Sequence, residues 1–151
     1  MKKKGFTLIE LMIVMAIIAI LVGMVLPRFK GLQDQAKISK AQGEVRALKT
    51  ALESYFIRWN GWPPAPAAGG SSIAWQAALV RTSPQLISAA LMDPFIGVGT
   101  TQQYSAALST NSQYYVIWAF GPDATTGVTG ISNEGVVAGT PGDDVWTSNA
   151  Q

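Results

Sequence analysis

The sequence predicts an α+β fold in which one long amino-terminal helix packs on a small antiparallel sheet. An apolar run extends from Phe6 to Leu26 and is followed, from Gln33 to Trp59, by apolar residues that recur every three or four positions. Residues 112–120 instead alternate between two faces, as strands do. A chain of 151 residues is long enough for one small domain and a membrane helix, but too short for two ordinary domains.

The apolar run has the length of a membrane span, for which about 20 apolar residues suffice. The preceding leader, Met1–Gly5, holds three lysines, and this basic cluster places the start of the chain in the cytoplasm. The run ends at Leu26-Pro27-Arg28, which offers no small-residue cleavage site of the secretory type. We therefore expect a single-pass segment that stays in the mature protein.

One carboxylate, Glu10, lies within the apolar run. A charged side chain costs about 2.5–3.5 kcal/mol at the centre of a bilayer and less toward the interface. A plain membrane anchor gains nothing from this cost. Glu10 is therefore expected to have a partner.

The second half of the helix is amphipathic. Its apolar face comprises Ile38, Ala41, Val45, Leu48, Leu52, Tyr55 or Phe56, and Trp59. The other face carries opposite charges four residues apart and is expected to be solvated; the pairs are Lys30/Asp34, Lys40/Glu44 and Lys49/Glu53. Pro27 lacks a backbone donor and Gly23 weakens the same turn, so a bend is expected there.

The residues after the long helix are expected to form a small globular head. The helix should stop at Asn60-Gly61-Trp62-Pro63, and short helices are expected at 74–80 and 85–91. Strands are expected at 102–108 and 112–120, joined across residues 109–111. In the second strand the set expected to face the helix is Tyr114, Val116, Trp118 and Phe120. The following stretch to Thr140 predicts a long loop with little structure, a type that is usually functional or disordered.

Composition argues against an enzyme. The chain has no histidine and no cysteine, which removes the commonest general base and the soft metal ligands. It also lacks a G-x-S-x-G elbow and a P-loop. The net charge of +2 depends on the three leader lysines, so bulk charge does not predict a nucleic-acid partner. The aromatic cluster at the helix end, Tyr55, Phe56, Trp59 and Trp62, is more typical of packing than of stacking on bases.

The segment Gly5-Phe6-Thr7-Leu8-Ile9-Glu10, placed after a basic leader, closely resembles the amino-terminal signature of type IV pilins and type II secretion pseudopilins. In that family a dedicated prepilin peptidase cuts after the glycine and methylates the exposed phenylalanine. The resemblance thus implies a leader at 1–5 and a transmembrane or filament-core half-helix at 6–27. It also implies a periplasmic, pilin-like head at 28–151, the whole resembling a ladle.

Cleavage at Gly5 would expose a charged amine on Phe6. The Glu10 carboxylate of a neighbouring subunit is the expected partner of that amine, which would make Phe6 and Glu10 assembly residues. The alternative is that Glu10 pairs only with the amine of its own chain and has no role in assembly. Filaments of this family melt part of the helix, which implies that the turn from Gly23 to Pro27 loosens in the filament.

The later layout resembles the major pseudopilin, the G subunit, of type II secretion. The similarity rests on Asn60-Gly61-Trp62-Pro63, Asp93-Pro94-Phe95, a tyrosine-rich strand, and a loop from Gly-Pro-Asp to Asp-Asp. In that subfamily the loop binds calcium, which implies ligands among Asp123, Asp143 and Asp144 and leaves open which of the last two points inward. A solvated tail is the alternative. Most type IV pilins close this region with a disulfide, so the absence of cysteine favours the pseudopilin branch.

The function that these features favour is that of a structural subunit of the periplasmic pseudopilus of a type II protein secretion system. The subunit is expected to sit in the inner membrane with its amino terminus in the cytoplasm and its head in the periplasm. The expected partners are further copies of itself, the prepilin peptidase, the inner-membrane assembly platform and minor pseudopilins. One alternative is a surface type IV pilus for adhesion, motility or DNA uptake. Another is a monomeric single-pass protein with a periplasmic binding head.

The leader offers the first test. Intact-mass measurement on protein from its own host should show loss of Met1–Gly5 and the gain of one methyl group on Phe6. Gly5→Val, which adds bulk at the scissile bond, should leave the precursor uncut. Retention of Met1 in native filaments would contradict the prediction.

Overall fold

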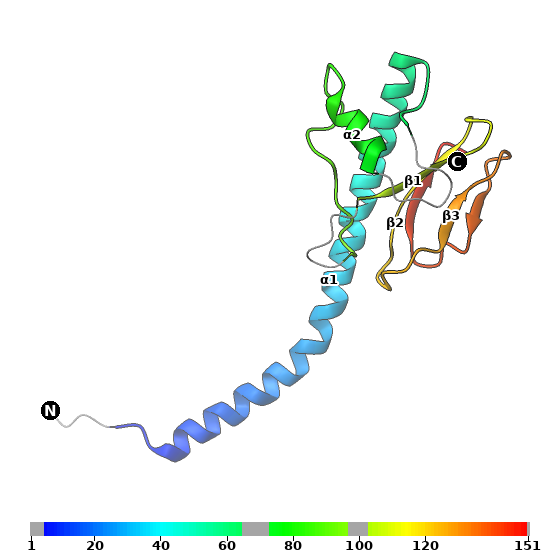
Figure 1. Cartoon of the computed structure of the whole chain (residues 1–151). Helices are drawn as coiled ribbons and strands as arrows, with labels where there is room; N and C mark the ends of the chain where they lie inside the picture. Colours follow the sequence, from blue (N-terminus) through cyan, green and yellow to red (C-terminus); the bar gives the residue numbers. More distant parts are fainter. Residues whose placement is uncertain (1–4, 65–72, 97–102, 151) are drawn as a thin grey trace. The chain divides into compact units, whose positions relative to one another are not determined.

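The structure, a computed structural model, describes residues 5–64, 73–96 and 103–150 (Figure 1). The elements follow in the order α1 (Leu8–Trp59), α2 (Ile73–Arg81), β1 (Ser105–Leu108), β2 (Tyr115–Ala119), β3 (Val128–Ile131), β4 (Val137–Gly139) and β5 (Val145–Ser148). The chain divides into two compact units, Met1–Ala36 and Lys37–Gln151, and each is described by itself. The predicted α+β class, a long helix with a small antiparallel sheet, is confirmed.

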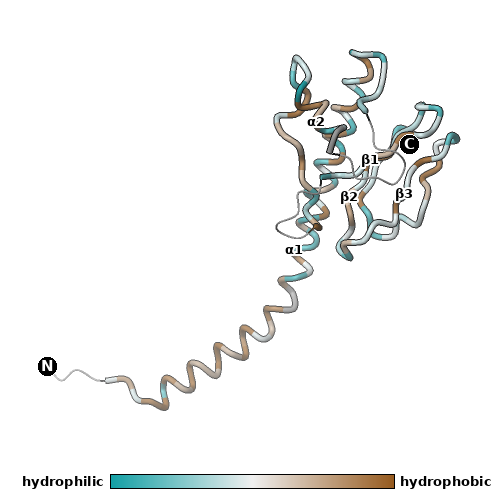
Figure 2. The backbone as a smooth tube through the Cα atoms, viewed as in Figure 1, coloured by the Kyte–Doolittle hydropathy of each residue, from teal (hydrophilic) through white to brown (hydrophobic). Residues whose placement is uncertain are grey.

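The first unit is the apolar half of α1, which Figure 2 shows as a nearly continuous hydrophobic segment. Its large apolar side chains are all exposed, from 46% at Val14 to 77% at Leu8. Within the described ranges, α1 is the one helix long and apolar enough to cross a membrane by length and composition. The backbone is helical through Gly23 and Pro27, and the bend expected there stays a prediction.

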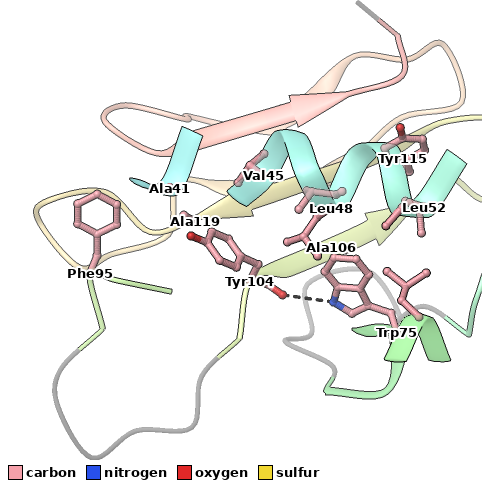
Figure 3. Packing of buried hydrophobic residues seen from close by; sticks show 13 residues of the cluster. Ala41, Val45, Leu48, Leu52, Trp75, Phe95, Tyr104, Ala106, Tyr115 and Ala119 are labelled. Carbon is pink, nitrogen blue, oxygen red and sulfur yellow. Dashed lines mark hydrogen bonds between the residues drawn. The ribbon is translucent and has the colours of Figure 1, made fainter. Parts of the chain in front are cut away.

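In the second unit the amphipathic half of α1 buries the middle of the predicted stripe, whereas Trp59 at its end is 41% exposed. Ala41, Val45, Leu48 and Leu52 are at most 4% exposed and point into the core drawn in Figure 3. The helix ends as predicted, because Asn60 adopts a positive φ of 50° and its N–H donates to Phe56 O at 2.8 Å.

The main sheet has the order β1-β2-β5, with antiparallel pairing throughout. The two expected strands are present, and over the described residues β1 and β2 are shorter than predicted; Gln102, the first residue of the range 102–108, lies outside the described residues. β5 was missed by the sequence analysis. It pairs with β2 in a register that sets Trp146 opposite Trp118.

The predicted orientation is wrong for Tyr114, Val116 and Trp118, although Phe120, which follows β2, does pack on the core that α1 covers. Tyr115, Ile117 and Ala119 belong to the core that α1 covers, whereas Val116 and Trp118 pack on the opposite side. The prediction assumed that only one face of the strand is well buried. All five β2 residues are buried because the β3–β4 hairpin covers the second face, and Trp118 packs there with Val128 and Ile131.

That hairpin also corrects the expectation of a long loop with little structure. β3 and β4 pair antiparallel within the stretch between Phe120 and Thr140, and Val128 is 1% exposed. Thr140 N–H closes the hairpin by donating to Gly127 O at 2.9 Å. A Cβ at Gly139, whose φ is +98°, would lie 2.0 Å from Gly127 O, so glycine is required there.

Helix α2 confirms the first of the two short helices expected in the head. The second, at 85–91, is wrong: the segment is a series of bends. Gln76 is fully buried, and its side chain accepts the Leu91 N–H at 2.7 Å and donates to Leu91 O at 3.3 Å. Leu86 N–H likewise donates to Leu79 O at 3.2 Å. These bonds replace the helical pairing that 85–91 would otherwise need.

Gln76→Leu should destabilise the head, since it leaves the N–H and C=O of Leu91 without these partners. We expect a loss of about 1–3 kcal/mol in the free energy of unfolding, the usual cost of a buried unsatisfied polar group. Gln113→Leu, at an exposed position, is the control. Equal stability of the two variants in chemical denaturation would contradict this role of Gln76.

Candidate functional site

The predicted processing and assembly residues lie at the start of α1. Thr7 precedes the helix, and Glu10 lies in its first turn. Glu10 Oε2 accepts the Thr7 N–H at 2.9 Å and the Thr7 hydroxyl at 2.8 Å, and Glu10 N–H donates to Thr7 Oγ1 at 3.3 Å. This reciprocal arrangement is a capping box, in which two side chains satisfy backbone donors at the helix start.

The capping box gives Glu10 a structural role that the sequence analysis missed. The first N–H groups of a helix have no partners within it, and a carboxylate there is also favoured by the helix dipole. The signal was present in the spacing Thr7-Leu8-Ile9-Glu10, an S/T-x-x-E pattern before an apolar run. Both cap bonds use Oε2, so the cap leaves Oε1 for another donor.

An apolar surface follows the cap along α1. Phe6 is 85% exposed just before the helix, and a shallow groove of about 390 Å³ lies further along. Its lining is entirely apolar and comprises Leu21, Val22, Val25, Leu26 and Phe29. Such a surface is suited to lipid or to the apolar face of another helix.

The charged face of α1 in the head is only partly solvated, which corrects the expectation for the Lys49/Glu53 pair. Lys40 and Glu44 form the predicted pair at 3.8 Å. Lys49 instead donates from Nζ to Ser148 O at 2.8 Å, which ties the helix to β5. Pairing along the helix was expected because the sequence does not show that a sheet edge lies over this face.

Two tyrosines complete the joint between helix and sheet. The Tyr115 hydroxyl donates to Glu53 Oε1 at 2.8 Å, and the Tyr104 hydroxyl donates to Glu44 Oε2. Burial, followed by the neighbouring carboxylate, raises the pKa of both tyrosines above the ordinary range. Both hydroxyls therefore stay protonated and remain donors.

The motif Asp93-Pro94-Phe95 forms a second joint. Asp93 is 5% exposed and accepts the N–H of Phe95 at 2.9 Å and that of Phe120 at 2.7 Å. Burial raises the pKa of this carboxyl, and the two N–H donors oppose part of the rise. The motif therefore fixes the end of β2.

The helix exit forms a third joint. The Trp62 indole N–H donates to Ser112 O at 2.7 Å, and its ring meets Tyr115 edge-on at 5.0 Å between centroids. Phe56 packs on the same ring at 4.3 Å. These aromatic residues have the packing role that the sequence predicted for them.

The three candidate metal ligands lie in the carboxy-terminal loop but point to different places. Asp123 accepts the Thr125 N–H at 2.9 Å and its hydroxyl at 2.7 Å, and the hydroxyl chiefly lowers the pKa of this carboxyl. Asp143 Oδ2 accepts the Asp123 N–H at 3.3 Å. Asp144 Oδ2 points inward and accepts N–H groups of residues 127 and 128 at 2.8 and 2.9 Å.

This arrangement is only a partial match to a calcium site. Across residues 5–64, 73–96 and 103–150, no three acidic side chains come together as a metal cluster. Asp144 Oδ1 is buried and has no hydrogen-bond partner among the described residues, and of the three carboxylates it offers the oxygen best placed to take a cation. Calcium binding stays a prediction.

Comparison with known proteins places the similarity at the amino terminus. The prokaryotic N-terminal methylation motif matches residues 1–26. The type II secretion system core protein G of Pseudomonas aeruginosa is 43% identical over 62 residues, which cover 41% of this chain and 44% of that protein. A fimbrial protein of the same organism is 52% identical over 55 residues, covering 36% of each chain. A type IV major pilin of Neisseria gonorrhoeae is 40% identical over 70 residues, covering 46% and 33%.

These matches span less than half the length of the curated relatives. No solved structure matches the chain. The amino-terminal part is therefore pilin-like, and the resemblance that the Gly5–Glu10 segment predicted is confirmed. The relatives are filament and secretion-system subunits rather than enzymes, in agreement with the prediction from composition.

The cap generates a prediction that is independent of filament formation. Thr7→Ala removes the hydroxyl that bonds Glu10 twice, and should weaken the first turn by about 0.5–2 kcal/mol. Amide exchange of residues 8–10 in detergent micelles should speed up accordingly. Thr7→Ser keeps the hydroxyl and should exchange at the wild-type rate. Wild-type rates in Thr7→Ala would contradict the cap.

Proposed function

We propose that the protein is a structural subunit of a helical filament, specifically of the periplasmic pseudopilus of a type II protein secretion system. The observation that carries this proposal is the methylation motif at residues 1–26, with Glu10 at the start of a half-helix whose large apolar side chains are all exposed. A helix apolar on every side needs lipid or other helices around it. A subunit that moves from the membrane into a filament is surrounded first by lipid and then by the helices of other subunits.

Assembly is proposed to use the charge pair between Phe6 and Glu10. Cleavage after Gly5 creates an amine that would be costly to leave unpaired among apolar side chains. Glu10 Oε1 in an adjacent subunit is free of the cap and can accept that amine while Oε2 keeps Thr7. Pairing both charges favours stacking of subunits and fixes their axial register.

The layout of the head supports the pseudopilus over a surface pilus. The Asn60-Gly61-Trp62-Pro63 exit, the Asp93-Pro94-Phe95 motif and the carboxy-terminal loop are the segments similar to the major pseudopilin. All three form hydrogen bonds within the head, to Ser112, to Phe120, and between Asp143 and the start of the loop. The chain closes this region without cysteine. A surface type IV pilus is the second candidate, favoured by the 52% identity to a fimbrial protein.

The proposed location follows from the leader and the helix. Before assembly the subunit sits in the inner membrane of a bacterium with two membranes, with Lys2–Lys4 in the cytoplasm and the head in the periplasm. The prepilin peptidase, the assembly platform and minor pseudopilins are its proposed partners. In the filament, the turn from Gly23 to Pro27 is proposed to loosen, because Pro27 has no N–H with which to form the helical hydrogen bond to the Gly23 carbonyl.

Replacement of Glu10 tests the assembly role. Glu10→Ala should insert and be processed normally, yet add poorly to filaments, since loss of one partner from a buried pair costs about 3–5 kcal/mol. Glu10→Gln keeps an oxygen for the Thr7 cap and lacks the charge, so it should also fail if charge pairing is what matters. The measurements are cleavage by immunoblot and filament yield by electron microscopy. A normal filament yield from Glu10→Ala would refute the role.

Calcium removal tests the proposed loop site. With Asp144 Oδ1 and the carboxylates of Asp123 and Asp143 as ligands, calcium should raise the melting temperature of the full chain in detergent micelles, and chelator should reverse the rise. Asp123→Asn should abolish the calcium-dependent part. An unchanged melting temperature, together with no heat of calcium binding, would leave the loop held by its own hydrogen bonds.

A further inference from the structure

An open groove of about 430 Å³ lies in the head between α1 and β5. Gln42, Val45 and Arg46 contribute to the helix wall, and residues 142–147 form the opposite wall. Arg46 is exposed, and among the residues that the structure describes it forms no ion pair. Arg46 is therefore a cation without an ion-pair partner in a groove whose other charged lining residues are Asp143 and Asp144.

One wall of the groove is the free edge of a sheet. β5 is the last strand in the order β1-β2-β5 and has a strand neighbour on one side only. Ser148 O is turned away from β2, because it accepts the Lys49 ammonium. Backbone groups two residues apart face the same edge, so the N–H and C=O of Trp146 face the groove. Unpaired edge groups of this kind are a ready template for another strand.

The β3–β4 hairpin has the complementary features. Across the described residues, β4 pairs with β3 alone, so its second edge is free as well. Val136, at the tip, is 65% exposed. Glu134 beside it is exposed, and its side chain has no hydrogen bond or ion pair to a described residue.

The hairpin tip is held in a fixed conformation before any contact. Asn133 Oδ1 accepts the Thr110 hydroxyl at 3.1 Å and the Asn111 N–H at 3.0 Å. The Asn111 side chain returns a bond to Asn133 O at 3.3 Å. A preorganised tip loses little conformational entropy when it binds.

We propose that the β3–β4 hairpin of a second copy occupies the groove, adding β4 to the free edge of β5 and pairing Glu134 of that copy with Arg46. Asp143 and Asp144 also line the groove, but their Oδ2 atoms accept the N–H of Asp123 and the N–H groups of residues 127 and 128. Arg46 is the charged lining residue whose side chain has no hydrogen bond or ion pair to a described residue, and it is the group that the incoming carboxylate would pair with. Groove and hairpin are different surfaces of the same chain, so the contact is heterologous. Repeated heterologous contacts generate rings or open helical arrays rather than a two-fold dimer, and the helical array is the outcome that fits a filament.

This inference rests on the proposed filament function, for which it supplies a contact between heads that is separate from the Phe6–Glu10 pair. It commits to a second copy because the hairpin of the same chain carries both a free strand edge and, in Glu134, a carboxylate without a partner among the described residues. A different protein in the groove is an outcome that the test below would reveal.

A charge exchange tests the pairing. Arg46→Glu and Glu134→Arg should each lower filament recovery about tenfold, since like charges then face each other across the contact. The double variant Arg46→Glu/Glu134→Arg should restore most of the loss, because it re-forms the pair in reverse. Lys37→Glu changes an exposed charge on the same helix outside the groove and is the matched control. Melting temperatures of all variants establish that the heads fold.

Cysteine crosslinking tests the geometry, since the natural chain has no cysteine. Gln42→Cys combined with Val136→Cys should give a ladder of disulfide-linked multimers when wild-type-like filaments are oxidised. Gln42→Cys combined with Ser88→Cys, an exposed position away from the hairpin, should give no ladder.

The outcomes separate this inference from the proposed function. Full filament recovery with Arg46→Glu, a double variant no better than the singles, or intact filaments without a ladder would each overturn the hairpin contact and leave the filament subunit standing. Crosslinks to another protein in place of a ladder would assign the groove to that protein. A wild-type chain that forms no filaments would overturn both.

Discussion

The packing of one face of α1 on β2 is the interaction on which the head depends. Small side chains, Ala41 on the helix and Ala119 on the strand, allow close approach, while Leu48 and Ile117 are fully buried between them. Figure 3 shows this core with Trp75 at its side, whose indole donates to Tyr104 O at 3.2 Å. Burial of this kind is worth about 25 cal/mol for each square ångström of apolar surface, so the stripe gives α1 its stable position in the head.

Hydrogen bonds fix the register of α1 on the sheet. Lys49 bonds the β5 edge, and Glu53 bonds Tyr115 on β2, so a shift of the helix by one turn would break both. Half-buried carboxylates such as Glu53 cost free energy unless they are hydrogen-bonded, which makes such contacts specific. The head thus holds the amphipathic half of α1 in one register.

The sequence predicts well where a pattern is local and strong. The apolar run, the Ala41–Leu52 stripe and the Asn60 stop were all recovered, because each depends on periodicity or on one turn residue. The orientation of β2 failed for a different reason. A strand buried on both faces has no polar face, so its sequence does not show which face packs on the helix. The hairpin that buries the second face, β3–β4, consists of two very short strands.

Among the candidate functional residues, too, the roles set by a local motif could be predicted from the sequence and those set by distant partners could not. A contiguous motif predicts the roles of Gly5, Phe6 and Glu10, and the same motif contains the pattern of the Thr7 cap. The roles of Lys49 and Gln76 depend on partners 99 and 15 residues away, which no local pattern reveals. The carboxy-terminal aspartates are intermediate: their presence in the loop was predicted, but only tertiary packing shows that Asp144 points inward.

The central claim is that this chain is a filament subunit whose helices pair through Glu10. Electron cryomicroscopy of filaments purified from the native host tests it most directly. The account predicts a core of packed α1 helices in which the Phe6 nitrogen of one subunit lies at about 3 Å, a hydrogen-bond distance, from a Glu10 oxygen of the next. A filament core in which each Glu10 contacts only its own chain would contradict it.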